Sequence, residues 1–144
     1  MILYQIAIGL MAIAINVAIH ASLSMAVVRP FRRHAANAKS NLQKELLIIA
    51  VVMWFVLSIC VQCWTWSGLF LWFGALGSLE EALYFTTVTF TTLGYGDVVL
   101  LPEWRLLGAF TATNGTIIIG WVTAMLFLAI QRVYNIGSHR RDSD

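Results

Sequence analysis

Three long uncharged runs constrain this chain more than any other feature. The run from Met1 to Val28 has no charged residue apart from His20, which we take as neutral, and Leu46–Leu79 and Leu106–Gln131 have no charged residue. A helix needs about 20 consecutive apolar residues to cross a bilayer. Only 11% of the 144 residues are charged, against about 25% in a typical soluble domain. The sequence therefore predicts an all-α membrane protein with three transmembrane helices.

The first run could in principle be a secretory signal peptide. However, no basic segment precedes it, and it is longer than the roughly 7–15 apolar residues of a signal core. Three arginines, Arg29, Arg32 and Arg33, follow it instead. We therefore expect a retained N-terminal transmembrane helix over residues 1–28 and a basic cytoplasmic loop over residues 29–45.

A fourth uncharged run, Ala82–Gly96, is too short to cross. Ser78 and Glu81 have the spacing of a capping box, which predicts a short helix over residues 79–90. Non-helical backbone at membrane depth is tolerated only where it is buried in protein or lines a water-filled cavity. The pattern therefore predicts a re-entrant helix that dips into the membrane and returns on the same side.

The basic residues are distributed unevenly around the predicted crossings, which indicates an orientation. Basic residues are enriched on the cytoplasmic side of membrane proteins. This rule places the N-terminus and the re-entrant segment outside, and the C-terminus in the cytoplasm. Those on the cytoplasmic side are Arg29, Arg32, Arg33, Lys39, Lys44, Arg132, Arg140 and Arg141, whereas Arg105 is outside. Tryptophans expected at the outer interface are Trp64, Trp66, Trp72 and Trp104.

The segment that follows the short helix, TTLGYGDVVL, contains residue types that allow backbone carbonyl groups to bind a cation. Gly94 and Gly96 permit backbone angles that other residues avoid, so a row of carbonyl oxygens can face one side and replace the water around a cation. Thr92 can add a hydroxyl group, and Tyr95 can brace the segment from behind. Asp97 can tie its outer end to the short helix.

Residues Thr92–Asp97 resemble the selectivity-filter signature of the potassium channels, with Leu93 where many members have Val or Ile. Residues 82–92 resemble the pore helix of the same family, and the resemblance extends over about 46–134. It implies an outer helix over about 46–67, a pore helix over about 79–90 and a filter at 92–97. An inner helix over about 105–131 and a short cytoplasmic tail at 135–144 complete the chain.

The resemblance implies a homotetrameric, potassium-selective channel in the plasma membrane or a bacterial inner membrane. Potassium ions would pass through passively, and no enzyme activity, organic cofactor, nucleic-acid partner or soluble ligand domain is implied. The expected filter residues are Thr92, Leu93, Gly94, Tyr95 and Gly96. The expected K⁺ ligands are the carbonyl groups of the first four and the Thr92 hydroxyl.

The sequence departs from many family members behind the filter. Val88 stands where some members have a carboxylate, and Tyr84 and Phe85 stand where some have tryptophans. The brace around the filter must therefore differ. We expect the Tyr84 hydroxyl to reach Asp97 and count Tyr84, Val88 and Asp97 as filter support.

The third crossing contains two glycines, Gly115 and Gly120, at positions that resemble those of simple bacterial potassium channels. Each can be a gating hinge or can permit close helix packing. Four residues follow helical spacing along one face and would line a cavity below the filter, with Phe127 as a candidate hydrophobic gate. They are Thr116, Ile119, Thr123 and Phe127.

Two polar residues, Asn16 and His20, lie on one face of the first helix. Polar side chains at that depth are costly; they either dock this helix on its neighbours or sense protons through His20. We expect Cys60 and Cys63 to pack rather than to bind metal.

Three rival functions remain compatible with the sequence. They are a poorly selective cation channel, a non-conducting membrane subunit with a vestigial filter, and a potassium transporter with channel-like loops.

Overall fold

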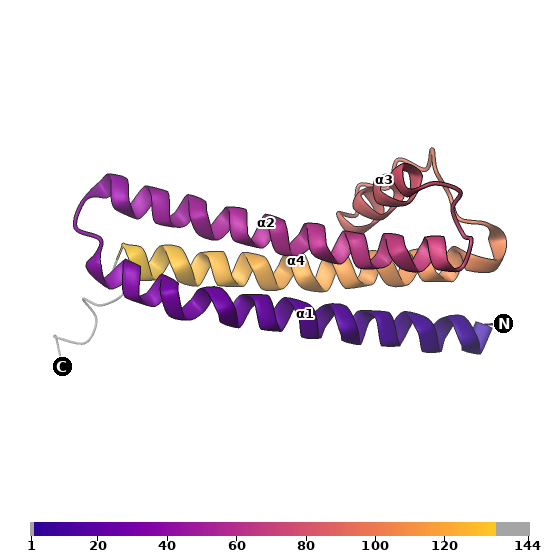
Figure 1. Cartoon of the computed structure of the whole chain (residues 1–144), viewed down its shortest axis with the longest axis horizontal. Coiled ribbons are helices and arrows are strands. Elements are labelled where there is room, and N and C mark those ends of the chain that lie inside the picture. Colours follow the sequence, from indigo (N-terminus) through magenta and orange to yellow (C-terminus); the bar gives the residue numbers. More distant parts are fainter. Residues whose placement is uncertain (1, 135–144) are drawn as a thin grey trace.

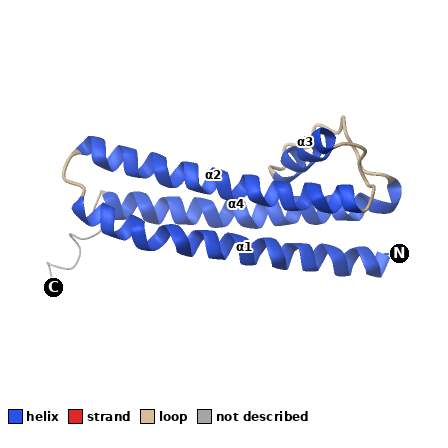
Figure 2. Cartoon of the chain, in the orientation of Figure 1, coloured by secondary structure: helices blue, strands red, loops and turns tan. Residues whose placement is uncertain are grey.

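The computed structural model describes residues 2–134 and consists of helices joined by short loops in that range. Three long helices, α1 (Ile2–Asn37), α2 (Asn41–Trp72) and α4 (Arg105–Val133), run side by side. The short helix α3 (Leu79–Phe90) and a 3₁₀ turn, η1 (Pro102–Trp104), lie at one end of this bundle. Figure 2 shows that the extended segment after α3 is the longest non-helical stretch between helices.

The three long segments are long and apolar enough to cross a membrane, as the uncharged runs predicted. The first and last of them, α1 and α4, run in the same direction, and α2 runs in the opposite direction. The N-terminus lies at the end of the bundle that carries α3, and α4 runs from that end to the opposite one (Figure 1). The short α1–α2 connection lies at the same end as the end of α4.

The basic loop expected at residues 29–45 is mostly helical, so this prediction was wrong. Helix α1 continues through Pro30 to Asn37, and α2 already begins at Asn41. Ser40 caps α2, because its side chain accepts a hydrogen bond from the backbone amide of Gln43, and Gln43 Oε1 accepts one from the backbone amide of Ser40. Arginine and lysine are good helix formers, so positive charge does not end a helix where the membrane ends.

The cap of α3 differs in detail from the expected box. The Ser78 hydroxyl accepts a hydrogen bond from the Glu81 amide at 3.1 Å. The Glu81 carboxylate accepts its bond from the amide of Gly77, at 3.2 Å, instead of the Ser78 amide. Both bonds still satisfy free amide groups at the start of the helix, and α3 occupies residues 79–90 as expected.

Helix α1 is held on α2 and α4 by a close approach and by polar contacts. Gly9 packs directly against the ring of Phe110, so that any larger side chain at position 9 would collide with it. His20 is fully buried; its Nδ1 lies 2.9 Å from Ser58 Oγ, and its ring packs edge-on against Trp121.

A second pair of polar residues extends this contact toward the end that carries α3. The Thr65 hydroxyl lies 2.9 Å from Asn16 Oδ1, and the Asn16 amide donates to the Ala12 carbonyl within α1. The polar face of α1 is therefore an interhelical face. This geometry accounts for Asn16 and His20 as docking residues.

One of the four tryptophans expected at the outer interface is in the core instead. Trp66 is 1% exposed and packs against Phe70, whereas Trp72 is 86% exposed. Tryptophan is both large and apolar, so composition cannot distinguish an interfacial position from a buried one.

Candidate functional site

The segment Thr92–Asp97 leaves the end of α3 as extended, non-helical backbone that is exposed in the single chain. The φ angles of successive residues in this segment alternate between positive and negative values. Thr92, Gly94 and Gly96 have φ values of 60°, 58° and 78°, and they are separated by Leu93 and Tyr95, whose φ is negative. Glycine adopts positive φ at little cost, whereas Thr92 is strained there.

Alternation of this kind changes where the peptide groups point. In a β-strand the successive carbonyl groups point to opposite sides, but residues of alternating hand turn them to one side and their amides to the other. Backbone of this type can present a row of like dipoles to an ion. The two glycines thus provide the conformational freedom that the sequence required at these positions.

The amides on one side of the segment are engaged by the end of α3. Leu93 N and Gly94 N both donate to the carbonyl of Val88, at 2.9 and 3.2 Å. Thr92 N donates to the carbonyl of Thr89 at 3.0 Å. Val88 therefore contacts the segment through its backbone, and the carbonyl groups of the segment are not used in these bonds.

Tyr84 and Asp97 lie together, as expected from the sequence. The Tyr84 hydroxyl donates a hydrogen bond of 2.6 Å to Asp97 Oδ2. This bond lowers the pKa of the Asp97 carboxyl, because it stabilises the charged form, and it raises the pKa of Tyr84. Asp97 Oδ1 also accepts a bond from the amide of Val98 at 3.0 Å. The bond to Tyr84 ties the far end of the segment back to α3.

Helix α3 is fixed to α2 by a buried polar contact and by aromatic packing. The Ser67 hydroxyl lies 3.1 Å from both the Ala82 carbonyl and Thr86 Oγ1. The rings of Phe70 and Phe85 meet edge to face, with centroids 5.4 Å apart. Ser67 and Thr86 were not recognised from the sequence, because a buried serine in an apolar helix carries no local signal of its partner.

Two glycines of α4 allow it to pack closely against α3. Gly115 lies directly against the backbone carbonyl of Phe90, where even a Cβ atom would collide. A Cβ atom at Gly108 would lie 3.3 Å from the ring of Phe85. Gly115 thus has a packing role at the point where the extended segment begins. Gly120 has open space around it, and α4 is continuous through both residues.

The expected cavity residues lie along a largely exposed face of α4. Thr116, Thr123 and Phe127 are exposed in the single chain, and Ile119 is half-buried. The opposite face of α4 carries the buried residues Thr111, Asn114, Ile118 and Val122. The structure therefore leaves three of the four expected residues exposed along one face of α4 in the single chain.

Within residues 2–134 no group of three or more His, Cys, Asp or Glu side chains is arranged to hold a metal ion. Cys60 and Cys63 are both free thiols, one exposed and one buried. The oxygen atoms that residues 92–96 offer to a cation are their backbone carbonyl groups and the hydroxyl groups of Thr92 and Tyr95.

Comparison with known proteins agrees with this arrangement. A family model described as "Ion channel" matches residues 45–132, which include most of α2, all of α3 and the extended segment, and nearly all of α4. Helix α1 lies outside the matched region. No curated protein and no solved structure matches the chain significantly. With three helices able to cross a membrane and a family match over more than half of its length, the chain is a multi-pass membrane protein that belongs to the ion channel family.

Proposed function

We propose that four copies of this chain surround a pore that conducts potassium ions selectively. Residues Thr92–Tyr95 supply the K⁺ ligands through their carbonyl groups, with the Thr92 hydroxyl at the inner end. The ion gives up its water shell, binds weakly at several sites in single file and leaves under repulsion from the next ion. Flux is passive and needs no organic cofactor.

The alternating hand of the backbone at Thr92, Gly94 and Gly96 carries this proposal. It is the conformation that turns carbonyl oxygens toward one side while the amides of Leu93 and Gly94 bond to Val88. A general glycine turn does not require three alternating left-handed residues, one of which is a strained threonine.

Two features of the single chain support a tetramer: its incomplete set of ion ligands and its exposed surfaces. A dehydrated cation needs oxygen ligands on all sides, but one copy of the segment supplies a single row. The segment is exposed, and so is the face of α4 that carries Thr116, Thr123 and Phe127. Four chains around one axis would cover both surfaces and place the C-terminal, negative ends of four α3 helices toward the ion path.

The distribution of charge supports one orientation of the chain in the membrane. The extended segment and the N-terminus lie at one end of the bundle, and the cluster of arginines and lysines lies at the other. Basic residues favour the cytoplasmic side. We therefore place the N-terminus and the mouth at Asp97 outside, in a plasma membrane or bacterial inner membrane.

Reconstitution in liposomes tests the function. Potassium-driven uptake should exceed sodium-driven uptake at least tenfold, and barium should block it. Gly94→Ala should abolish the flux, because alanine is strained at the φ of 58°. Gly68→Ala is the matched control, since Gly68 lies in α2 with open space around it.

Other outcomes would separate the rival functions. Equal potassium and sodium flux, lost in Gly94→Ala, would identify a poorly selective cation channel. A protein without flux under any membrane potential, and with no tetramer in detergent, would identify a non-conducting subunit and overturn the proposal.

A further inference from the structure

A hollow of about 790 Å³ opens between α1, α2 and α4 at the end of the bundle opposite α3. Its size lies within the roughly 300–1,000 Å³ typical of small-molecule sites. Each of the three helices contributes both apolar and basic side chains to its lining. Because α1 forms one wall, the hollow is made partly from the segment outside the ion-channel match.

Most of the lining of the hollow is apolar. Its walls are formed by aliphatic and aromatic side chains from all three helices, and the segments that carry them are candidate membrane spans. The main apolar residues are Val27, Phe31, Val51, Phe55, Met125 and Leu128. A hydrocarbon chain fits such a surface, whereas a soluble anion gains nothing from it.

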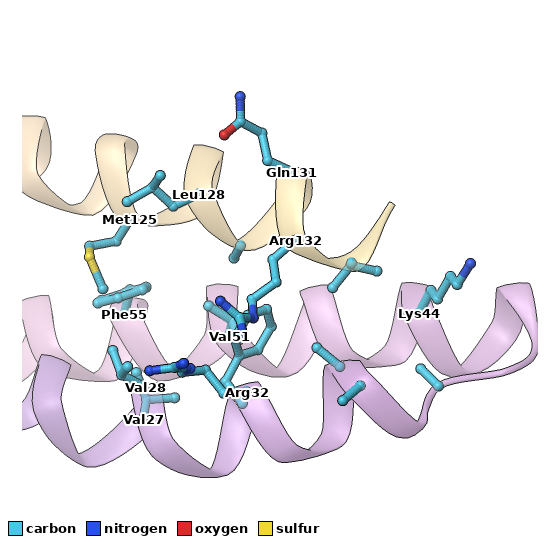
Figure 3. A pocket seen from close by; sticks show the side chains of 16 residues that line it. Val27, Val28, Arg32, Lys44, Val51, Phe55, Met125, Leu128, Gln131 and Arg132 are labelled. Carbon is cyan, nitrogen blue, oxygen red and sulfur yellow. The ribbon is translucent and has the colours of Figure 1, made fainter. Parts of the chain in front are cut away.

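Three basic side chains, one from each helix, line the same hollow. Arg32 comes from α1, Lys44 from α2 and Arg132 from α4. Figure 3 shows Arg32 and Arg132 extending toward the same space from facing helices, with Lys44 farther along the rim. No Asp or Glu among residues 2–134 lines the hollow.

Positive charges that share a space without an acidic partner repel one another and favour an anion between them. Arginine is well suited to a phosphate group, because its planar guanidinium can donate two parallel hydrogen bonds. Basic pockets between transmembrane helices on the cytoplasmic side are suited to lipid headgroups. A ligand with a phosphate next to a hydrocarbon chain matches both parts of the hollow.

We propose that this hollow is a binding site for an anionic phospholipid. Arg32 and Arg132 hold the headgroup phosphate, Lys44 adds charge at the rim, and an acyl chain lies against Val51 and Phe55. The lipid thereby links α1 to the last turns of α4, one turn beyond Phe127. This binding does not depend on ion selectivity, so it can be tested whether or not the protein conducts potassium.

Native mass spectrometry of the full-length protein, with lipids added in detergent, tests the site. Phosphatidylglycerol should be retained at least tenfold more strongly than phosphatidylcholine. The double variant Arg32→Gln/Arg132→Gln should lose at least tenfold in phosphatidylglycerol retention, because charge-assisted hydrogen bonds to the phosphate are removed. Arg33→Gln is the matched control, since Arg33 is the adjacent arginine of α1 and does not line the hollow.

A second variant keeps the charges and fills the space. Ala35→Trp places a large ring at the lining of the hollow and should also weaken phosphatidylglycerol retention. Circular dichroism would establish that each variant keeps its helices.

Three results would overturn the proposal. The first is equal retention of the two lipids, and the second is unchanged phosphatidylglycerol retention in both Arg32→Gln/Arg132→Gln and Ala35→Trp. The third is displacement of the lipid by inorganic phosphate at similar concentration, which would make the site one for a soluble anion.

Discussion

The hydroxyl of Tyr84 donates a 2.6 Å hydrogen bond to Asp97 Oδ2, and so joins the middle of α3 to the residue that follows the second glycine of the extended segment. Among residues 2–134 it is the one hydrogen bond that connects the outer end of this segment to α3, whereas the inner end is held by the Val88 carbonyl. The two ends are therefore anchored to the same short helix by different means.

Tyr84→Phe should raise the pKa of Asp97 toward its ordinary value of 3.8, because the bond from Tyr84 is the main cause of the lowered pKa. A carboxylate titration by ¹³C NMR measures this change. Potassium flux should also decay faster in the variant, since the outer end of the segment loses its anchor. Tyr4→Phe, at an exposed tyrosine in α1, is the control.

The sign of the pH effect follows from the same bond. Because the pKa of Asp97 is lowered in the folded protein, the bond contributes stability above pH 3.8, and this contribution is lost as the pH falls through the lowered pKa. In Asp97→Asn this contribution is absent, so the stability of the variant should not change as the pH falls below 3.8 through the range in which Asp97 titrates. An unchanged pKa of Asp97 in Tyr84→Phe would contradict the assignment.

Gly115→Ala should destabilise the protein by about 1–3 kcal/mol, the usual cost of overpacking. The added methyl group would collide with the Phe90 carbonyl, which forms the end of α3. Thermal unfolding in detergent measures the effect. Gly120→Ala should be neutral or stabilising, because its surroundings are open and alanine favours a helix by about 1 kcal/mol.

The same pair of variants tests the hinge alternative. If Gly120→Ala keeps stability but reduces channel opening, α4 bends at Gly120 during gating. If neither variant changes opening once stability is restored by lower temperature, neither glycine is a gating hinge, and Gly115 serves packing alone.

The contact between His20 and Ser58 should contribute to the docking of α1. A double-mutant cycle with His20→Ala and Ser58→Ala should give a coupling energy of roughly 0.5–2 kcal/mol, the range of hydrogen bonds between transmembrane helices. Zero coupling would show that the two side chains do not stabilise each other. Flux measured against pH should have the same profile in His20→Ala, and a lost pH response would instead identify His20 as a proton sensor.

Phe127→Ala should increase flux through the closed channel, because Phe127 is 61% exposed on the face of α4 that we place toward the pore. A hydrophobic constriction blocks ions by excluding water. Leu128→Ala is the control, since Leu128 lines the hollow beside α1 on another face of the same helix. Equal leak in the two variants would exclude Phe127 as the gate.

Local patterns in the sequence were sufficient for the number and order of the helices and for the position of the extended segment. The uncharged runs gave three crossings, Ser78 marked the start of α3, and Gly94 and Gly96 marked the positions that need positive φ. Each of these signals depends on residues close together in the chain.

Contacts between distant segments could not be predicted in the same way. The approach of Gly9 to Phe110, the bond from Ser67 to Thr86 and the burial of Trp66 all depend on how helices face one another. The extension of α1 to Asn37 was missed because a cluster of arginines was interpreted as a loop. The basic hollow could not be predicted either, because its lining comes from the ends of three helices that are far apart in the sequence.

The reversal potential of the reconstituted protein tests potassium selectivity most directly. With potassium on both sides of a planar bilayer and sodium added to one side, the reversal potential should shift by about 59 mV for each tenfold potassium gradient. Sodium should leave it unchanged. A reversal potential that follows the sum of potassium and sodium would show that the carbonyl groups of Thr92–Tyr95 do not select potassium, and it would contradict the proposed function.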